Sequence, residues 1–265
     1  MISRRSSALL CFFASTALTA APAVSDVSLV TVDVLTGWST EEGTHMGGLR
    51  LDLADGWKTY WRSPGDTGIP PQFDWSDSEN IADVRIHWPR PEVFDTYGQR
   101  SIGYGSDVIL PVEVTPADPS KPIRLHGQAS LGVCHDVCVP VHTSFGYSAL
   151  PEIDSQAIRA ALSALPDSSA MVGASCKVEP IADGLRITAT LDAPQMGGSE
   201  VTVFELSDPS IWVSETTTER RGRTVTAVAE FVPPSATPFV LDRSEVRITL
   251  LGSEAAAETL GCTAG

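Results

Sequence analysis

The sequence has few basic residues, few cysteines and, beyond its first two dozen residues, no long apolar run. Lysine and arginine together number 18 against 33 acidic residues, which gives a formal net charge of −15. A charge of this sign disfavours nucleic acid and anionic membrane surfaces as partners. No stretch after residue 23 approaches the roughly 18 apolar residues of a membrane-spanning helix. The sequence therefore argues against a nucleic-acid partner and against a spanning helix in the rest of the chain.

Residues 1–23 have the three parts of a secretory signal peptide. Arg4 and Arg5 supply the positive charge, residues 8–20 form the apolar segment, and Ala21-Pro22-Ala23 is an A-x-A cleavage site. We therefore expect the chain to be exported to an oxidising compartment, where cysteines pair. Of the five cysteines, Cys11 lies inside this segment and is expected to be removed with it.

The first half of the mature chain alternates apolar and polar residues as β-strands do. The alternation covers 30–34, 49–53, 108–114 and 123–129, with turn-forming clusters between these stretches. No helical pattern precedes residue 150. The pattern predicts an antiparallel β-sandwich over residues 26–150.

The pattern changes over residues 151–170, which we interpret as a linker. Ile158, Leu162 and Leu165 have helical spacing after a possible N-cap at Asp154 or Ser155, and Pro166 ends the run. This predicts a short helix.

Alternation then resumes over residues 171–265 and predicts a second all-β domain. Cys176 stands just before the first predicted strand of this domain and Cys262 just after the last. Because the first and last strands of a sandwich often lie close together, we expect a structural Cys176–Cys262 disulfide.

Cys134 and Cys138 are separated by three residues within a stretch that otherwise reads as strand. In a straight strand their Cα atoms would lie about 13 Å apart, whereas a disulfide requires less than about 7 Å. If the two cysteines pair, the chain must fold back at 135–137. The spacing then predicts a hairpin with a dithiol or disulfide at its tip.

Three roles remain open for this pair on spacing alone. It could be a redox pair, in which a thiolate attacks a partner's disulfide and the second thiol resolves the product. It could be a structural staple, although closing so short a loop removes little unfolded-state entropy. It could bind copper or zinc with His135 and His142, because soft thiolates and imidazoles suit these metals.

Three separated motifs resemble one known family. These are G-W-K-T-Y-W at 56–61, F-D-T-Y-G at 94–98 followed by L-P-V at 110–112, and Cys134-x3-Cys138-Val139-Pro140. Together they resemble the N-terminal periplasmic domain of the thiol-disulfide interchange protein DsbD, and the ScsB-like branch in particular. The family has a wider gap between its cysteines than the three residues here.

The resemblance implies a fold, a site and partners. The expected fold is all-β, with two immunoglobulin-like β-sandwich domains joined by the short helical linker. Cys134 and Cys138 would be the catalytic pair of a protein-disulfide reductase or electron-relay component in the periplasm, with no cofactor. Electrons would come from a membrane-embedded thiol reductase and pass to periplasmic thioredoxin-like oxidoreductases. The alternative is a copper-binding or copper-tolerance module that uses Cys134, Cys138, His135 and His142.

The resemblance also implies a cap loop that covers the cysteines when no partner is docked. Phe94 or Tyr97 would be the shielding ring, and the stretch lacks a strand periodicity, so it is expected to be a loop. The residues carried over to this cap are Phe94, Asp95, Thr96, Tyr97 and Gly98.

Overall fold

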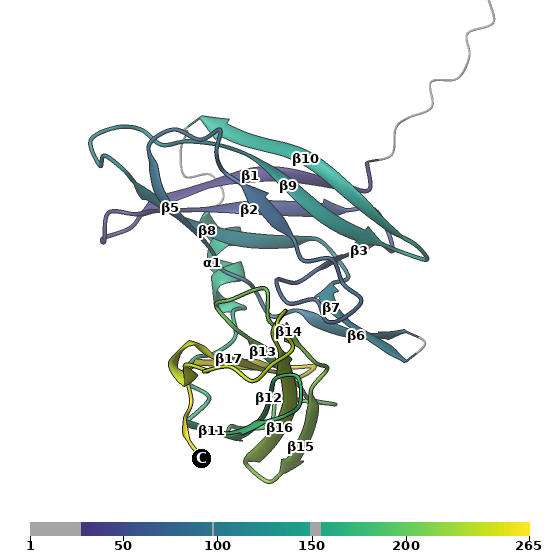
Figure 1. Cartoon of the computed structure of the whole chain (residues 1–265). Coiled ribbons are helices and arrows are strands. Elements are labelled where there is room, and N and C mark those ends of the chain that lie inside the picture. The colour runs from purple at the N-terminus through teal and green to yellow at the C-terminus, as the bar shows by residue number, and fades with distance from the viewer. Residues whose placement is uncertain (1–27, 97, 149–154) are drawn as a thin grey trace, which may run out of the picture.

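The computed structural model describes residues 28–96, 98–148 and 155–265 (Figure 1). Within these ranges the chain forms β-strands, one α-helix and one 3-10 turn, so the predicted all-β, immunoglobulin-like class is confirmed. No helix of these ranges is long and apolar enough to cross a membrane. The predicted signal peptide and Tyr97 lie outside the described residues.

The N-terminal sandwich, residues 28–148, consists of two antiparallel sheets. The first has the order β1-β2-β8-β5 and the second β10-β9-β3-β7-β6, with β4 paired to β9. The strands of the first sheet are β1 (Val30–Ser39), β2 (His45–Leu53), β5 (Ile81–Ile86) and β8 (Val108–Pro116). Those of the second are β3 (Lys58–Tyr60), β4 (Gln72–Asp74), β6 (Glu92–Thr96), β7 (Gln99–Tyr104), β9 (Arg124–Cys134) and β10 (Cys138–Ser148).

Side chains from the inner faces of both sheets form one core. Leu49 and Leu110 from the first sheet belong to the same buried cluster as Leu131 and Val133 from the second. Trp61, which directly follows β3, is fully buried in this cluster. The alternation in the sequence arises because successive residues of a strand point to opposite faces of the sheet, and one face is buried here.

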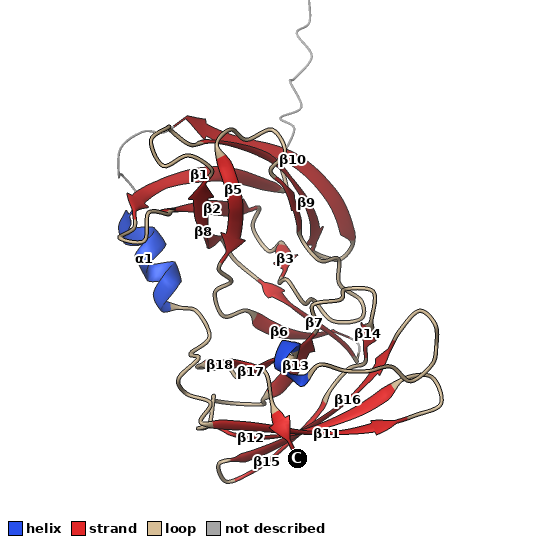
Figure 2. Cartoon of the chain, turned by 60° about the vertical axis from the view of Figure 1, so that its left-hand side comes forward, coloured by secondary structure: helices blue, strands red, loops and turns tan. Residues whose placement is uncertain are grey.

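The helix α1 (Ser155–Ser163) packs on the N-terminal sandwich, beside the first sheet (Figure 2). Ile158 is its buried residue and forms a small apolar cluster with Leu35 and Met46. The Arg159 guanidinium also lies 4.0 Å from the centre of the Trp38 ring. The predicted linker helix is therefore attached along one side of the sandwich.

The C-terminal unit, residues 173–265, has a larger sheet of order β14-β16-β12-β11-β19, with β15 paired to β16, and a smaller sheet of order β13-β17-β18. The larger sheet contains β11 (Gly173–Pro180), β12 (Leu185–Asp192), β14 (Trp212–Val213), β15 (Thr217–Arg221), β16 (Thr224–Val232) and β19 (Thr263–Ala264). The smaller contains β13 (Val201–Glu205), β17 (Arg247–Leu251) and β18 (Ala256–Leu260), and the turn η1 (Arg243–Glu245) precedes β17.

The smaller sheet contributes to two cores. Val201 and Val203 belong to the buried cluster of the N-terminal sandwich, whereas Phe204 and Ile248 belong to the core of the C-terminal unit. Burial of apolar surface on both faces of this sheet is favourable at about 25 cal/mol per Å². The sandwich and the C-terminal unit are therefore joined by a packed apolar interface.

Candidate active site

The two central cysteines lie at the tip of the β9–β10 hairpin and form a disulfide. Cys138 is directly opposite Cys134 in the strand register, and their Cα atoms are 4.1 Å apart. The backbone N–H of His135 donates to the carbonyl oxygen of Val137 at 3.1 Å and closes the three-residue loop. Directly opposed residues of an antiparallel pair project from the same face, so the hairpin brings the two sulfurs together.

The two cysteines differ in exposure because their strands occupy different places in the sheet. Cys134 ends β9, which has β10 on one side and β3 on the other, and its exposed fraction is 5%. Cys138 begins the edge strand β10 and is exposed. Of the two cysteines, Cys138 is therefore the one that a partner protein meets from solvent.

Tyr60 on β3 places its hydroxyl beside both sulfurs. The oxygen lies 3.1 Å from Cys134 Sγ and 3.2 Å from Cys138 Sγ. Disulfide sulfurs carry no hydrogen, so the hydroxyl is the donor in either contact. Burial raises the pKa of Tyr60 above its ordinary value, which keeps the proton on the hydroxyl at neutral pH.

Gly132 makes room for the Tyr60 ring. A Cβ atom at this position would lie 2.8 Å from Cδ2 of Tyr60 and 2.9 Å from Cβ of Ile69. Such separations are closer than packed atoms tolerate, so a larger residue would push the ring away from the sulfurs. The glycine, two residues before Cys134, thus helps to set the position of the hydroxyl.

Lys58 extends the row of residues that contains the cysteines. It is opposite Cys134 in the β3–β9 register, so Lys58, Cys134 and Cys138 project from one face of three neighbouring strands. The Lys58 ammonium lies 4.4 Å from the centre of the Phe94 ring, as in a cation–π contact. Sequence reasoning missed Lys58 and Tyr60, although their two-residue spacing in the 56–61 run is the signal of a shared strand face.

The expectation that the cap stretch is a loop was wrong. Its first three residues lie in strand β6, and Thr96 pairs with Gln99 of β7, which directly follows the turn at Gly98. Gly98 in this turn has a φ of 78°, a conformation that favours glycine. The strand is held by its pairing with β7 and by the packing of Val93 against the core of the sandwich.

Phe94 lies on the face of the β6–β7 hairpin that carries the contact with Lys58. A Cβ atom on Gly105 would lie 3.2 Å from Cζ of Phe94, so the ring covers this glycine. The structure brings Phe94 to Lys58, the immediate cross-strand neighbour of Cys134, and Tyr97 lies outside the described residues.

The two histidines near the cysteines have other neighbours. The His135 ring lies 5.8 Å from the Trp57 ring, and its Nδ1 is 3.0 Å from the Asp136 carboxylate. Nδ1 of His142 is 2.9 Å from the hydroxyl of Ser130. Over the part of the chain that the structure describes, no three His, Cys, Asp or Glu side chains are grouped so as to hold a metal ion.

A second disulfide joins Cys176 to Cys262 across the C-terminal unit, with Cα atoms 5.7 Å apart and a sequence separation of 86 residues. Cys176 lies on β11 and is fully buried. Cys262 follows β18, and the next residues pair with β11 as strand β19. This bond ties the end of the chain to the first strand of the unit.

The strand that carries Lys58 and Tyr60 leads directly to the C-terminal unit. Nε of Arg62 donates to the Glu205 carboxylate at 2.9 Å, and Nη2 of Arg62 also pairs with Glu258. Burial opposes the charge of Arg62, but these carboxylates outweigh it and raise the pKa of Arg62. Burial likewise opposes the charge of Glu258, and Arg62 and Arg247 outweigh it and lower the pKa of Glu258.

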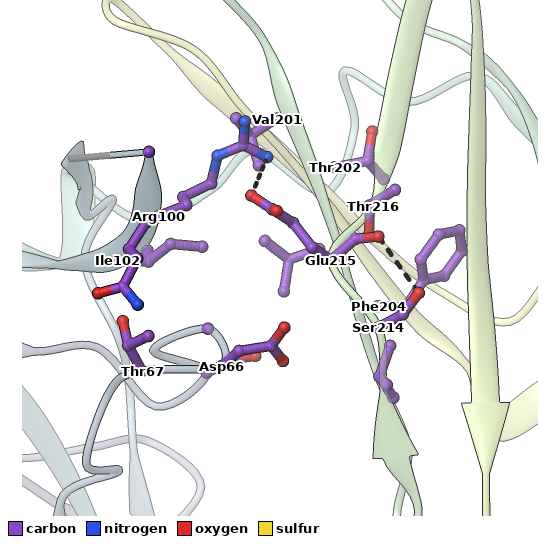
Figure 3. A pocket seen from close by; sticks show the side chains of 16 residues that line it. Asp66, Thr67, Arg100, Ile102, Val201, Thr202, Phe204, Ser214, Glu215 and Thr216 are labelled. Atoms are coloured by element: carbon purple, nitrogen blue, oxygen red, sulfur yellow. Dashed lines mark hydrogen bonds and ion pairs between the residues drawn. The ribbon is translucent and has the colours of Figure 1, made fainter. Parts of the chain in front are cut away.

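A cavity of about 260 Å³ lies between the β6–β7 hairpin and the C-terminal unit (Figure 3). Arg100 of β7 reaches across it, and its Nη1 is 3.1 Å from the Glu215 carboxylate. Asp95, the register partner of Arg100 on β6, lies 3.7 Å from Nε of the same guanidinium. The hairpin that carries Phe94 is thus ion-paired to the C-terminal unit.

The chain is similar to a known family over residues 26–147 and to a solved structure over most of its length. Residues 26–147 match the family model described as "Thiol:disulfide interchange protein DsbD, N-terminal". A solved structure of similar fold is the N-terminal periplasmic domain of ScsB from Proteus mirabilis. It has a TM-score of 0.66 and 20% sequence identity, over 89% of this chain and 92% of that one. No curated protein sequence matches.

The fold and the family match together define a domain of the thiol:disulfide interchange type. More particularly, residues 26–147 form a DsbD N-terminal-like domain. The disulfide at the tip of the β9–β10 hairpin lies within this domain.

Proposed function

We propose that the protein is a periplasmic electron relay that acts by thiol-disulfide exchange at Cys134 and Cys138. It would accept electrons from a membrane-embedded thiol reductase and pass them to thioredoxin-like oxidoreductases. The observation that carries the proposal is the asymmetry of the pair. Cys138 is exposed at a hairpin tip, and Cys134 is buried with a hydroxyl donor 3.1 Å from its sulfur.

In the first half-reaction a thiolate of the reductase attacks Sγ of Cys138. A new bond forms between the two proteins, the Cys134–Cys138 bond breaks, and the electron pair leaves on the Cys134 sulfur as a thiolate. The Tyr60 hydroxyl donates a hydrogen bond to that thiolate without giving up its proton. A second thiolate of the reductase then attacks the reductase sulfur that is bonded to Cys138. The reductase forms its own disulfide, and the Cys138 thiolate is released.

In the second half-reaction the Cys138 thiolate attacks a disulfide of the acceptor and releases one acceptor thiolate. Cys134 then attacks Cys138 Sγ, which re-forms the internal disulfide and releases the second acceptor thiolate. The acceptor gains two electrons and the relay returns to its oxidised form. The register that opposes Cys134 to Cys138 keeps the resolving sulfur next to its target.

Apolar side chains near the exposed Cys138 support docking of a partner. Val137, in the hairpin loop, has an exposed fraction of 65%, and Ile69, beside Gly132, of 41%. Exposed apolar residues grouped around a reactive atom are typical of a protein interaction site. We propose that a thioredoxin-like partner covers them when it presents its own cysteines.

Trapping of mixed disulfides tests the relay. A Cys134→Ser variant keeps the exposed Cys138 and lacks the resolving thiol, so it should accumulate a mixed disulfide with a thioredoxin-like protein. Cys138→Ser should accumulate much less, because Cys134 is buried. Mass spectrometry of the linked peptides identifies both partners. If neither variant forms a mixed disulfide while the wild type exchanges with no thioredoxin-like protein, the relay proposal fails.

The periplasmic location rests on the predicted signal peptide at residues 1–23 and on the similar ScsB structure, which is described as periplasmic. The copper-binding alternative requires imidazoles that can turn toward the sulfurs, whereas His135 and His142 contact Asp136 and Ser130. Titration of the reduced protein with copper(I) separates the two functions. Tight binding that is lost in a His135→Ala, His142→Ala double variant would favour the copper alternative.

A further inference from the structure

Lys58 is the charged residue closest in register to the disulfide, and its ammonium contacts the Phe94 ring. Cys138, Cys134 and Lys58 are successive cross-strand neighbours on β10, β9 and β3. Directly opposed residues of an antiparallel pair have Cβ atoms about 4.5–5.5 Å apart. The flexible lysine stem can therefore bring its ammonium either toward the Cys134 sulfur or toward Phe94, where the structure has it at 4.4 Å from the ring centre.

We infer that Lys58 is a positioning residue that couples the β6–β7 hairpin to the chemistry of Cys134. With Phe94 in place, the ammonium is held on the ring. When a docking partner displaces Phe94, the ammonium is released and stabilises the negative charge that develops on the Cys134 sulfur. This inference rests on the proposed function, and it assigns to Lys58 a role in the exchange.

The exchange creates a negative charge near Lys58, on the Cys134 sulfur. As the incoming thiolate bonds to Cys138, the negative charge moves from the attacking sulfur to the Cys134 sulfur. A thiolate whose negative charge is stabilised is a faster leaving group. A nearby cation stabilises that charge more strongly where water is partly excluded. No proton is transferred, because Lys58 acts through its charge and Tyr60 through its hydrogen bond.

Other charged or titratable groups also lie around Cys134. Tyr60 projects from β3 with its hydroxyl at the sulfurs, and Nδ1 of His135 lies 3.0 Å from the Asp136 carboxylate in the hairpin loop. Glu92 is on the same strand as Phe94, and its carboxylate is near Gly105. Among these side chains Lys58 is the one opposite Cys134 in register and also in contact with Phe94.

The test uses the full chain with Cys138→Ser, so that Cys134 is the free thiol of the pair and no partner is needed. The ultraviolet absorbance of the thiolate is followed against pH. Lys58→Gln should move the midpoint of this titration up by about half a pH unit, as expected for loss of one partly screened charge. Lys58→Arg, which keeps the charge, should restore the midpoint to within a fraction of that shift.

Phe94→Leu sharpens the test because it removes the ring and keeps Lys58. It should move the midpoint down, and combining it with Lys58→Gln should give the midpoint of Lys58→Gln alone. The inference is overturned if Lys58→Gln leaves the midpoint unchanged, if Lys58→Arg shifts it as far as Lys58→Gln, or if Phe94→Leu acts equally with and without Lys58. Since the assay needs no redox partner, these results are independent of the trapping experiment.

Discussion

The chain has two disulfides that are built in opposite ways. Cys134–Cys138 closes a three-residue loop at a hairpin tip, with Cys138 exposed and a hydroxyl beside both sulfurs. Cys176–Cys262 spans 86 residues and ties the last strand to a fully buried position on the first strand of its unit. The chemical bond is the same in both places, so loop length, burial and neighbouring groups must make the difference in role.

In the chain-entropy treatment, closing the long loop disfavours the unfolded state by about 4–5 kcal/mol, and closing the short loop by at most about 2 kcal/mol. The long-range bond is therefore well suited to stabilisation. The hairpin bond contributes less to stability, and the exposed Cys138 makes it open to attack.

The largest expected effect is on exchange in the hairpin pair. Cys134→Ser and Cys138→Ser should each abolish complete electron transfer to a thioredoxin-like acceptor, because resolution requires the second thiol. Each should unfold with a free energy at most about 2 kcal/mol below that of the wild type. Denaturant unfolding and an insulin-type turnover assay measure the two quantities. A variant that unfolds at the outset would assign a structural role to the bond.

The next effect is on stability and concerns the other pair. A Cys176→Ser, Cys262→Ser double variant should lose about 3–5 kcal/mol of unfolding free energy and retain exchange at Cys134–Cys138. The structural role assigned to Cys176–Cys262 would be contradicted if this variant is as stable as the wild type. It would also be contradicted if the variant loses exchange while it remains folded.

Glu258 tests how the two regions are joined. Its pKa is lowered below the ordinary value of 4.5, since Arg62 and Arg247 outweigh the effect of burial. A lowered pKa in the folded state means that the carboxylate stabilises the fold above about pH 4.5, and that this contribution is lost as the pH falls through the lower folded-state value. Glu258→Gln should cost roughly 1–3 kcal/mol at neutral pH.

The difference between this variant and the wild type should shrink as the pH falls below 4.5, the ordinary value for Glu258. Denaturant unfolding over a pH series measures it. Glu230→Gln, which removes the exposed partner of Arg186, is the matched control and should cost well under 1 kcal/mol. Equal effects of the two substitutions at every pH would contradict a special role for the interface pair.

Tyr60 tests whether the neighbours of the hairpin disulfide matter for rate. Tyr60→Phe keeps the ring over Gly132 and removes the hydroxyl, so exchange should slow by about tenfold, the equivalent of a hydrogen bond to a charged group worth about 1.4 kcal/mol. Stopped-flow reduction by dithiothreitol follows the rate. The control is Tyr147→Phe, which should leave the rate unchanged because residue 147 pairs with Leu125, at the opposite end of the β9–β10 hairpin from Cys138.

The smallest effect concerns the ion pair between the β6–β7 hairpin and the C-terminal unit. Glu215→Gln removes the partner of Arg100 and should loosen the β6–β7 hairpin. Because Phe94 of this hairpin contacts Lys58, the register neighbour of Cys134, a small alkylating reagent should then react about twofold faster with the reduced cysteines. Ion pairs of this exposure are worth up to about 1 kcal/mol. Glu219→Gln, on the nearby strand β15, serves as the control. A slower reaction in Glu215→Gln would contradict the tethering.

Much of this architecture could be predicted from the sequence, because a half-buried strand shows its two faces as alternation. The stretches at 30–34 and 49–53 lie in β1 and β2, and the β9–β10 hairpin is the one that the three-residue gap predicted if Cys134 and Cys138 pair. The β6 strand was missed because it is short and its stability comes from pairing with β7 and from the packing of Val93 against the core. These are tertiary contacts that no local pattern reports.

The site was only partly predictable for the same reason. The two cysteines could be singled out by their spacing in the sequence. Tyr60 and Lys58, more than 70 positions earlier in the sequence, become neighbours of the sulfurs only when β3 pairs with β9. The sequence also did not predict that the three-stranded sheet β13-β17-β18 contributes side chains to two cores. Alternation reveals one buried face, whereas Val203 and Phe204 are buried on opposite faces of β13.

The most direct measurement opens the two disulfides in competition. The full chain is equilibrated in a graded series of dithiothreitol redox buffers, quenched, alkylated and digested, and the alkylated peptides of all four cysteines are quantified by mass spectrometry. The account predicts that Cys134 and Cys138 become alkylated together and reversibly while Cys176 and Cys262 remain bonded in the folded protein. Opening of both disulfides in one step, or of Cys176–Cys262 first, would contradict it.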